Sequence, residues 1–190
     1  MDSLFALKGH DFVLVAGEST IMQSIFKLKP NFDKSIALDT NILLAMAGEH
    51  ADREVFGPFI QRNIQYFKFK NGIPLTVEET ANFTRTKLAE GLRKQPYHVS
   101  SIVAGVDRKG PQIYWLDYMG TMSEVPYGAH GYAAYFVSSV LSNAWKPNLT
   151  REQAVDIVKM AIHELRTRFM IAQDNFIVKL VDANGIQVIN

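Results

Sequence analysis

The chain has 190 residues, of which 47% are hydrophobic and 21% are charged, and its formal net charge at pH 7 is +1. This length and composition predict a single globular domain, 1–190, and the near-zero charge argues against a surface dedicated to nucleic acid. The sequence contains no cysteine, which excludes disulfides, thiolate metal sites and a thiol nucleophile.

The first twenty residues lack a basic and apolar leader, and no stretch approaches the ~18 apolar residues of a membrane span. We therefore expect an intracellular protein with no membrane partner.

The first third of the chain predicts two hairpins and a helix. Runs rich in β-forming residues cover 3–8 and 11–17, and a second pair covers 35–39 and 42–47. From about residue 51 to 70 the apolar spacing changes to three and four, which predicts a helix ending at Asn71-Gly72. The apolar stripe of that helix is predicted at Val55, Phe59, Ile60, Ile64 and Phe67.

The same helix is unusually rich in aromatic side chains. We expect core packing to absorb about three of them and a protein interface to use the rest. The five aromatic residues are Phe56, Phe59, Tyr66, Phe67 and Phe69.

The remaining chain repeats this order of elements. Thr76 with Glu79, and Thr150 with Gln153, form two capping-box patterns, each at the start of an apolar helical stripe. The predicted elements after residue 75 are helix 76–92, strands 99–106 and 112–118, helices 131–144 and 150–169, and strands 176–182 and 186–189. Hairpins grouped between paired helices favour an α+β fold, a four-layer αββα sandwich, over a Rossmann-like alternation.

A search for catalytic and ligand-binding motifs gives no positive result. The five histidines lack the spacing of a zinc site, and no glycine-rich phosphate loop is present. Gly17-Glu18-Ser19-Thr20 does not complete a nucleophile elbow, so Ser19 is interpreted as a turn residue. We predict no cofactor and no metal.

Eight segments nevertheless carry a resemblance that covers nearly the whole chain. In chain order they are FVLVAGEST, ILLAMAGEHAD, FIQRNIQYFKFKNG, ANFTRTKLAEGLR, PYHVSSIVAGVD, IYWLDYMG, AHGYAAYFV and RFMIAQDNFIVKLVDANGI. Together they resemble the β subunits of the eukaryotic 20S proteasome. The resemblance implies the αββα fold of N-terminal nucleophile hydrolases. It also implies a place in a ring of seven β subunits, between two ring neighbours, an α ring and the opposing β ring, in cytoplasm and nucleus.

In catalytic members of that family, an N-terminal threonine supplies both a hydroxyl nucleophile and a basic α-amine. The resemblance places Asp2 at the position of this threonine, with only Met1 ahead of it and no propeptide expected. The aspartate that orients the family's lysine falls at Glu18, and the lysine itself is kept as Lys34. A carboxylate at position 2 offers no hydroxyl, so the resemblance implies a non-catalytic β subunit.

The other supporting positions of the family are also replaced. The serine of its Gly-Ser-Gly turn falls at His130, which we expect to be a buried imidazole bonded to the backbone. The later aspartate and serine fall at Phe169 and Ala172, neither of which can take part in proton transfer. Lys34 is then interpreted as a structural partner of Glu18 or as a surface charge.

Two alternatives stay open at this point. One is a working hydrolase whose nucleophile is Ser3 or Thr20, activated by Lys34. The other is a free-standing homo-oligomer of the same fold, although such an assembly would be inactive without the threonine. We also expect Met1 to be retained and acetylated, because the bulky side chain of Asp2 hinders removal of the methionine.

Overall fold

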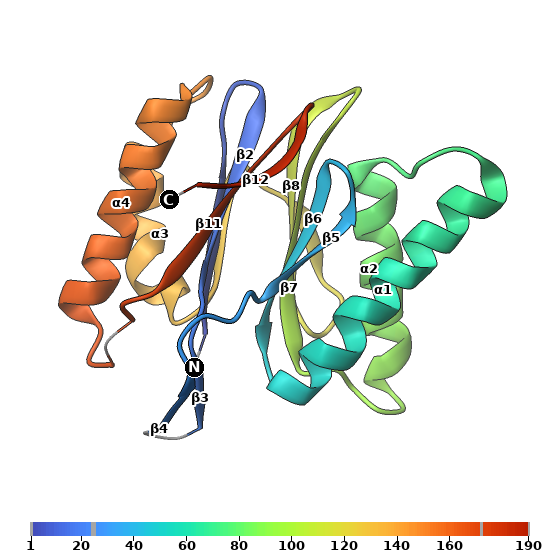
Figure 1. Ribbon diagram of the computed structural model, residues 1–190, viewed down its shortest axis with the longest axis horizontal. Coiled ribbons are helices and arrows are strands. Elements are labelled where there is room, and N and C mark those ends of the chain that lie inside the picture. The colour runs from blue at the N-terminus through green and yellow to red at the C-terminus, as the bar shows by residue number, and fades with distance from the viewer. Residues whose placement is uncertain (1, 24–25, 172, 190) are drawn as a thin grey trace.

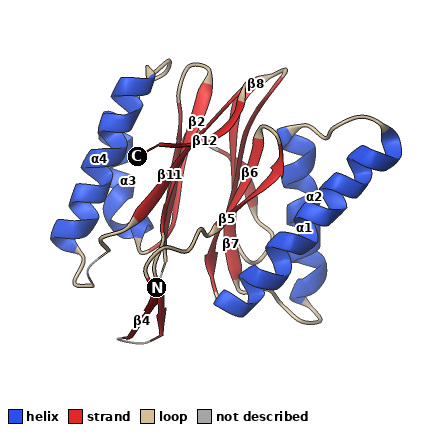
Figure 2. Ribbon diagram, viewed as in Figure 1, coloured by secondary structure: helices blue, strands red, loops and turns tan. Residues whose placement is uncertain are grey.

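The computed structural model describes residues 2–23, 26–171 and 173–189 (Figure 1). Two antiparallel sheets lie face to face, and a pair of helices covers the outer face of each (Figure 2). The predicted four-layer αββα sandwich is therefore confirmed.

Each central sheet has five strands. The first has the order β10-β1-β2-β11-β12 and the second the order β5-β6-β7-β8-β9. The first sheet contains β1 (Ser3–Lys8), β2 (Phe12–Glu18), β10 (Tyr127–Gly131), β11 (Phe176–Asp182) and β12 (Gly185–Ile189). The second contains β5 (Ser35–Asp39), β6 (Ile42–Gly48), β7 (Val99–Asp107), β8 (Gly110–Leu116) and β9 (Met122–Glu124). A separate two-stranded sheet joins β3 (Ile21–Gln23) to β4 (Phe26–Lys29).

The helices form the two outer layers. α1 (His50–Asn71) and α2 (Val77–Leu92) pack on the second sheet, and α3 (Ala133–Ala144) and α4 (Arg151–Arg168) pack on the first. Both capping boxes predicted from the sequence are formed, at Thr76 and at Thr150. Among the described residues, no helix is long and apolar enough to cross a membrane.

Three apolar layers hold the sandwich together. The layer between the sheets consists largely of small and branched side chains, among them Val13, Val15, Ala45, Ile102 and Ala104. Two outer layers lie between each sheet and its helices. Burial of these side chains is the main favourable contribution to folding. It also fixes the strand ends that build the site described below.

The buried face of α1 differs from the predicted stripe. It runs through Arg53, Phe56, Gly57, Ile60 and Ile64, and the predicted members of the stripe at 55, 59 and 67 are exposed. The reason is a close approach at Gly57, where a Cβ would collide with the side chain of Met46 on β6. The helix therefore lies against the sheet along its glycine side, and Phe56 is its only fully buried aromatic residue.

The start of α3 also differs from the prediction. Gly131 is the last residue of β10 and pairs with Ser3, so the helix begins at Ala133. Gly131 has φ +67°, and a Cβ there would collide with the carbonyl of Asp2. Glycine is the residue that adopts this backbone without strain. The sharp bend at Gly131 brings the chain entering α3 against the residue in front of β1.

Candidate functional site

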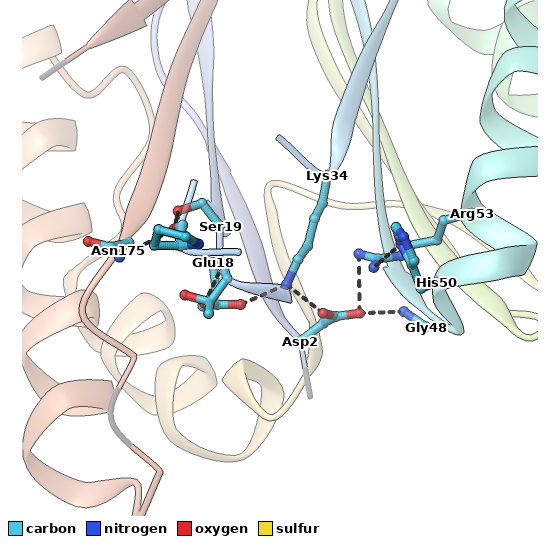
Figure 3. Close-up of polar contacts among 10 residues, drawn as sticks. Asp2, Glu18, Ser19, Lys34, Gly48, His50, Arg53 and Asn175 are labelled. Atoms are coloured by element: carbon cyan, nitrogen blue, oxygen red, sulfur yellow. Dashed lines mark hydrogen bonds and ion pairs between the residues drawn. The ribbon is translucent and has the colours of Figure 1, made fainter. Parts of the chain in front are cut away.

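Asp2 lies immediately in front of β1, at one end of the space between the two sheets. Its carbonyl accepts a hydrogen bond from Tyr132 N at 3.0 Å. Its side chain points toward Lys34, Gly48 and Arg53, which come from three different parts of the chain (Figure 3). The first residue of the described chain is thus held by both its backbone and its side chain.

Lys34 bridges two carboxylates. Its Nζ lies 2.6 Å from Asp2 Oδ1 and 2.7 Å from Glu18 Oε2. The side chains of Lys34, Glu18 and Asp2 are 5%, 2% and 9% exposed. The second carboxylate oxygen of Glu18 accepts a hydrogen bond from Thr20 N at 2.6 Å. Buried charges are tolerated when they are paired and hydrogen-bonded in this way.

Arg53 supplies a second cation from the first turns of α1. Its Nη1 lies 3.4 Å from Asp2 Oδ2, and the same oxygen accepts a hydrogen bond from Gly48 N at 2.8 Å. We call Asp2, Glu18, Lys34 and Arg53 the Asp2 cluster. It joins two anions to two cations, so its formal charge sums to zero.

The pKa of Asp2 is lowered by this environment. Burial by itself raises the pKa, but the charges of Lys34 and Arg53 and the hydrogen bonds from Lys34 and Gly48 outweigh burial. A general base works best when its pKa is near the working pH. The Asp2 carboxylate is therefore a weak base at neutral pH, and it carries no hydroxyl that could attack a carbonyl.

An open groove of about 700 Å³ begins at Asp2, and its lining includes the aromatic residues His98, Trp115, Tyr118 and Tyr135. Among the described residues, no group of three or more His, Asp or Glu side chains is arranged to hold a metal ion.

Comparison with known proteins identifies the family. Residues 2–181 match the family model described as proteasome subunit. The chain is 41% identical over 186 residues to proteasome subunit beta type-2 of Oryza sativa, covering 97% of this chain and 88% of that protein. It is 40% identical to proteasome subunit beta type-2-A of Arabidopsis thaliana, covering 97% of this chain and 91% of that protein. It is 39% identical to the probable proteasome subunit beta type-4 of Schizosaccharomyces pombe over the whole of both chains.

The chain belongs to the proteasome subunit family. The four-layer sandwich is thus the N-terminal nucleophile hydrolase fold, as the resemblance implied. Three positions that the resemblance assigned to catalysis, Asp2, Glu18 and Lys34, meet in one cluster. The structure confirms that Glu18 and Lys34 pair, and the interpretation of Lys34 as a surface charge is wrong.

His130 is buried, as expected for a structural imidazole. Its Nε2 lies 3.0 Å from the carbonyl oxygen of Ser101, and its ring stacks on Trp115 with centroids 4.5 Å apart. Burial lowers the pKa of His130 to about 4, although the backbone hydrogen bond acts in the opposite direction. The imidazole is therefore neutral at pH 7 and is held by the stacking on Trp115 and the hydrogen bond to Ser101.

Phe169 is part of an aromatic contact at the end of α4. Its ring stacks on Tyr132 at 4.8 Å and lies 5.6 Å from the ring of Phe136. Aromatic packing thus occupies this position, where proton transfer would need a polar side chain. Ala172 lies outside the described residues, as does Met1.

The alternative nucleophiles are not engaged by Lys34. The hydroxyls of Ser3 and Thr20 are buried and have no hydrogen-bond partner among the described residues. Nucleophilic catalysis needs a base within hydrogen-bond reach of the hydroxyl. Ser19 is also buried, and its Oγ donates to the carbonyl oxygen of Pro30 at 3.2 Å. That bond joins the end of β2 to the segment that carries Lys34.

Arg53 is the member of the cluster that sequence reasoning missed. It lies in the run His50-Ala51-Asp52-Arg53-Glu54, which is typical of a solvated first helical turn. The signal that could have found it is its spacing of three, four and seven from Phe56, Gly57 and Ile60. This spacing places Arg53 on the buried face of α1.

Proposed function

We propose that this protein is a non-catalytic structural subunit of the 20S proteasome β ring, at the fourth ring position that the beta type-2 resemblance implies. It would be one chain of a threonine-type endopeptidase complex that degrades ubiquitin-tagged proteins. The observation that carries the proposal is the Asp2 cluster. An ion-paired carboxylate stands where the family's catalytic members have a threonine, and the lysine that would assist catalysis is bound between two carboxylates.

The outer face of α1 supports a role in assembly. Tyr66 is 62% exposed and Phe69 is 89% exposed, and Val55 and Ile73 add to the same helix and the turn after it. Exposed aromatic side chains of this kind are enriched in protein interfaces. The partners proposed for the whole subunit are two β-ring neighbours, the α ring and the opposing β ring, in cytoplasm and nucleus.

Native purification of the tagged chain from its own cells, followed by native mass spectrometry, tests this function. The proposal predicts that the chain is recovered in a multi-ring assembly of many different subunits. Recovery only as a monomer or a homo-oligomer would contradict the proposal.

A further inference from the structure

A second groove is lined by residues of α4 and of strands β11 and β12, on the face of the first sheet that points away from the second sheet. Figure 1 shows the arrangement of these elements. It has a volume of about 550 Å³, within the range of ligand-binding sites. It is separate from the Asp2 cluster, none of whose four members lines it.

One wall of this groove is an open sheet edge. β12 is the last strand in the order of the first sheet and pairs only with β11 among the described strands. Alternate N–H and C=O groups of such a strand point away from the sheet and are free to pair with another chain. Val188, the next-to-last residue of β12, is 60% exposed. It lies in the groove lining beside Ile189.

The floor of the groove is apolar and its helical rim is cationic. Val155 and Ile162 of α4, with Phe176 and Val178 of β11, supply apolar side chains. On the rim, the cations Lys159 and Arg166 lie seven residues apart and so share one face of α4. Lys159 Nζ lies 3.8 Å from Asp156 Oδ1 in an exposed pair. The one carboxylate in the lining, Asp174, lies 3.9 Å from Lys27 Nζ.

We propose that this groove binds an extended segment of another protein chain, which adds a strand along β12. The open edge would supply main-chain hydrogen bonds, and the apolar floor would take every second side chain of the segment. The cationic rim selects a segment whose remaining side chains are acidic. The proposal goes beyond the proposed function, because it concerns one groove and one kind of ligand.

The charge of the rim argues against a second copy of this chain as the occupant. A two-fold dimer through β12 would place the same patch opposite itself. Lys159 and Arg166 of one copy would then face the same cations of the other. Like charges across an interface suppress association.

The test uses the purified full chain and a fluorescein-labelled nonapeptide of alternating valine and glutamate. Fluorescence polarisation should detect binding of this peptide and much weaker binding of a valine–lysine peptide. Amide hydrogen exchange should slow in β12 and not in β9, one of the two edge strands of the second sheet. Lys159→Glu should weaken binding about fivefold, by replacing an attraction with a repulsion.

Arg168→Glu is the matched control, because Arg168 lies on the same helix and is 69% exposed but does not line the groove. This variant should bind the acidic peptide like the wild type. The proposal is overturned if the acidic peptide does not bind, if the basic peptide binds equally well, or if Lys159→Glu has no larger effect than Arg168→Glu. Protection of β12 by dimerisation of the chain itself would also overturn it.

Discussion

The two ends of α1 differ in what they bury and what they expose. At its first turns, α1 sends Arg53 inward to complete a buried set of four charges in which every member has an opposite charge within 4 Å. At its far end it leaves Phe69 and Tyr66 exposed. The charges of the cluster are therefore paired within the chain, whereas the aromatic face is the surface that we propose for a partner. This contrast agrees with the assembly role that we propose.

Removal of the central cation should have the largest effect on the cluster. Lys34→Met leaves the carboxylates of Asp2 and Glu18 buried without the ammonium that joins them. Loss of one partner from a buried ion pair costs about 3–5 kcal/mol. Urea unfolding of the purified chain should show this loss as a lower midpoint.

Lys68→Met is the control for Lys34→Met. Lys68 pairs with Asp39 at 2.6 Å, but its side chain is 45% exposed. An exposed pair contributes about 0–1 kcal/mol. Equal losses in the two variants would show that burial does not distinguish the cluster from an ordinary surface pair.

The loss of folding stability at acid pH should depend on Asp2. Because the folded-state pKa of Asp2 is lowered, its contribution is complete above the ordinary pKa of about 4 and is lost as pH falls through the lowered value. Asp2→Asn should cost about 2–3 kcal/mol at pH 7. The difference from wild type should shrink as the pH falls below about 4.

Asp11→Asn provides the comparison, since Asp11 is 62% exposed and lies 3.6 Å from Arg151. Its effect should stay below about 1 kcal/mol at neutral pH. A difference between Asp2→Asn and wild type that does not change with pH would rule out the assigned pKa shift.

α2 packs on the same sheet as α1, which carries the aromatic face. Thr76→Ala removes a capping box in which Thr76 and Glu79 bond each other's backbone N–H groups. We expect a loss of about 1 kcal/mol, or about 2–4 °C in melting temperature by calorimetry. Thr86→Ala, in the same helix, replaces an exposed residue that bonds only its own helix, at Asn82 O, and should cause no loss.

Substitutions on the aromatic face should have the smallest effect on the free chain. Phe69→Ser and Tyr66→Ser change exposed side chains, so the free energy of unfolding should move by no more than about 0.5 kcal/mol. Incorporation into the native assembly should fall when tagged variants compete with wild type in cells. Gln65→Ser, on the same helix, should incorporate normally. Normal incorporation of both aromatic variants would remove this face from the proposed interface.

Much of the fold was predictable because local signals and burial agree. The hairpin partners β1 and β2 and the capped helices α2 and α4 follow from residue spacing and from Thr76 and Thr150. The short strand β10 was not predictable in this way. Its sequence YGAHG has low β propensity, and it becomes a strand because β1 offers it an edge.

The Asp2 cluster was also predictable only in part. The pairing of Glu18 with Lys34 could be proposed from the family resemblance. The part played by Arg53 could not, since it depends on the close approach of α1 to β6 at Gly57. The charged residues next to Arg53 in the sequence give no indication that its side chain is buried. The unpredicted parts are those in which tertiary packing overrides local preference.

The most direct test of the account is the intact mass of this chain after the native assembly has reacted with a covalent inhibitor directed at N-terminal threonines. The account predicts that other chains of the assembly gain the mass of the inhibitor and that this chain does not. A mass increase on this chain would contradict the central claim that the Asp2 cluster has replaced a catalytic centre.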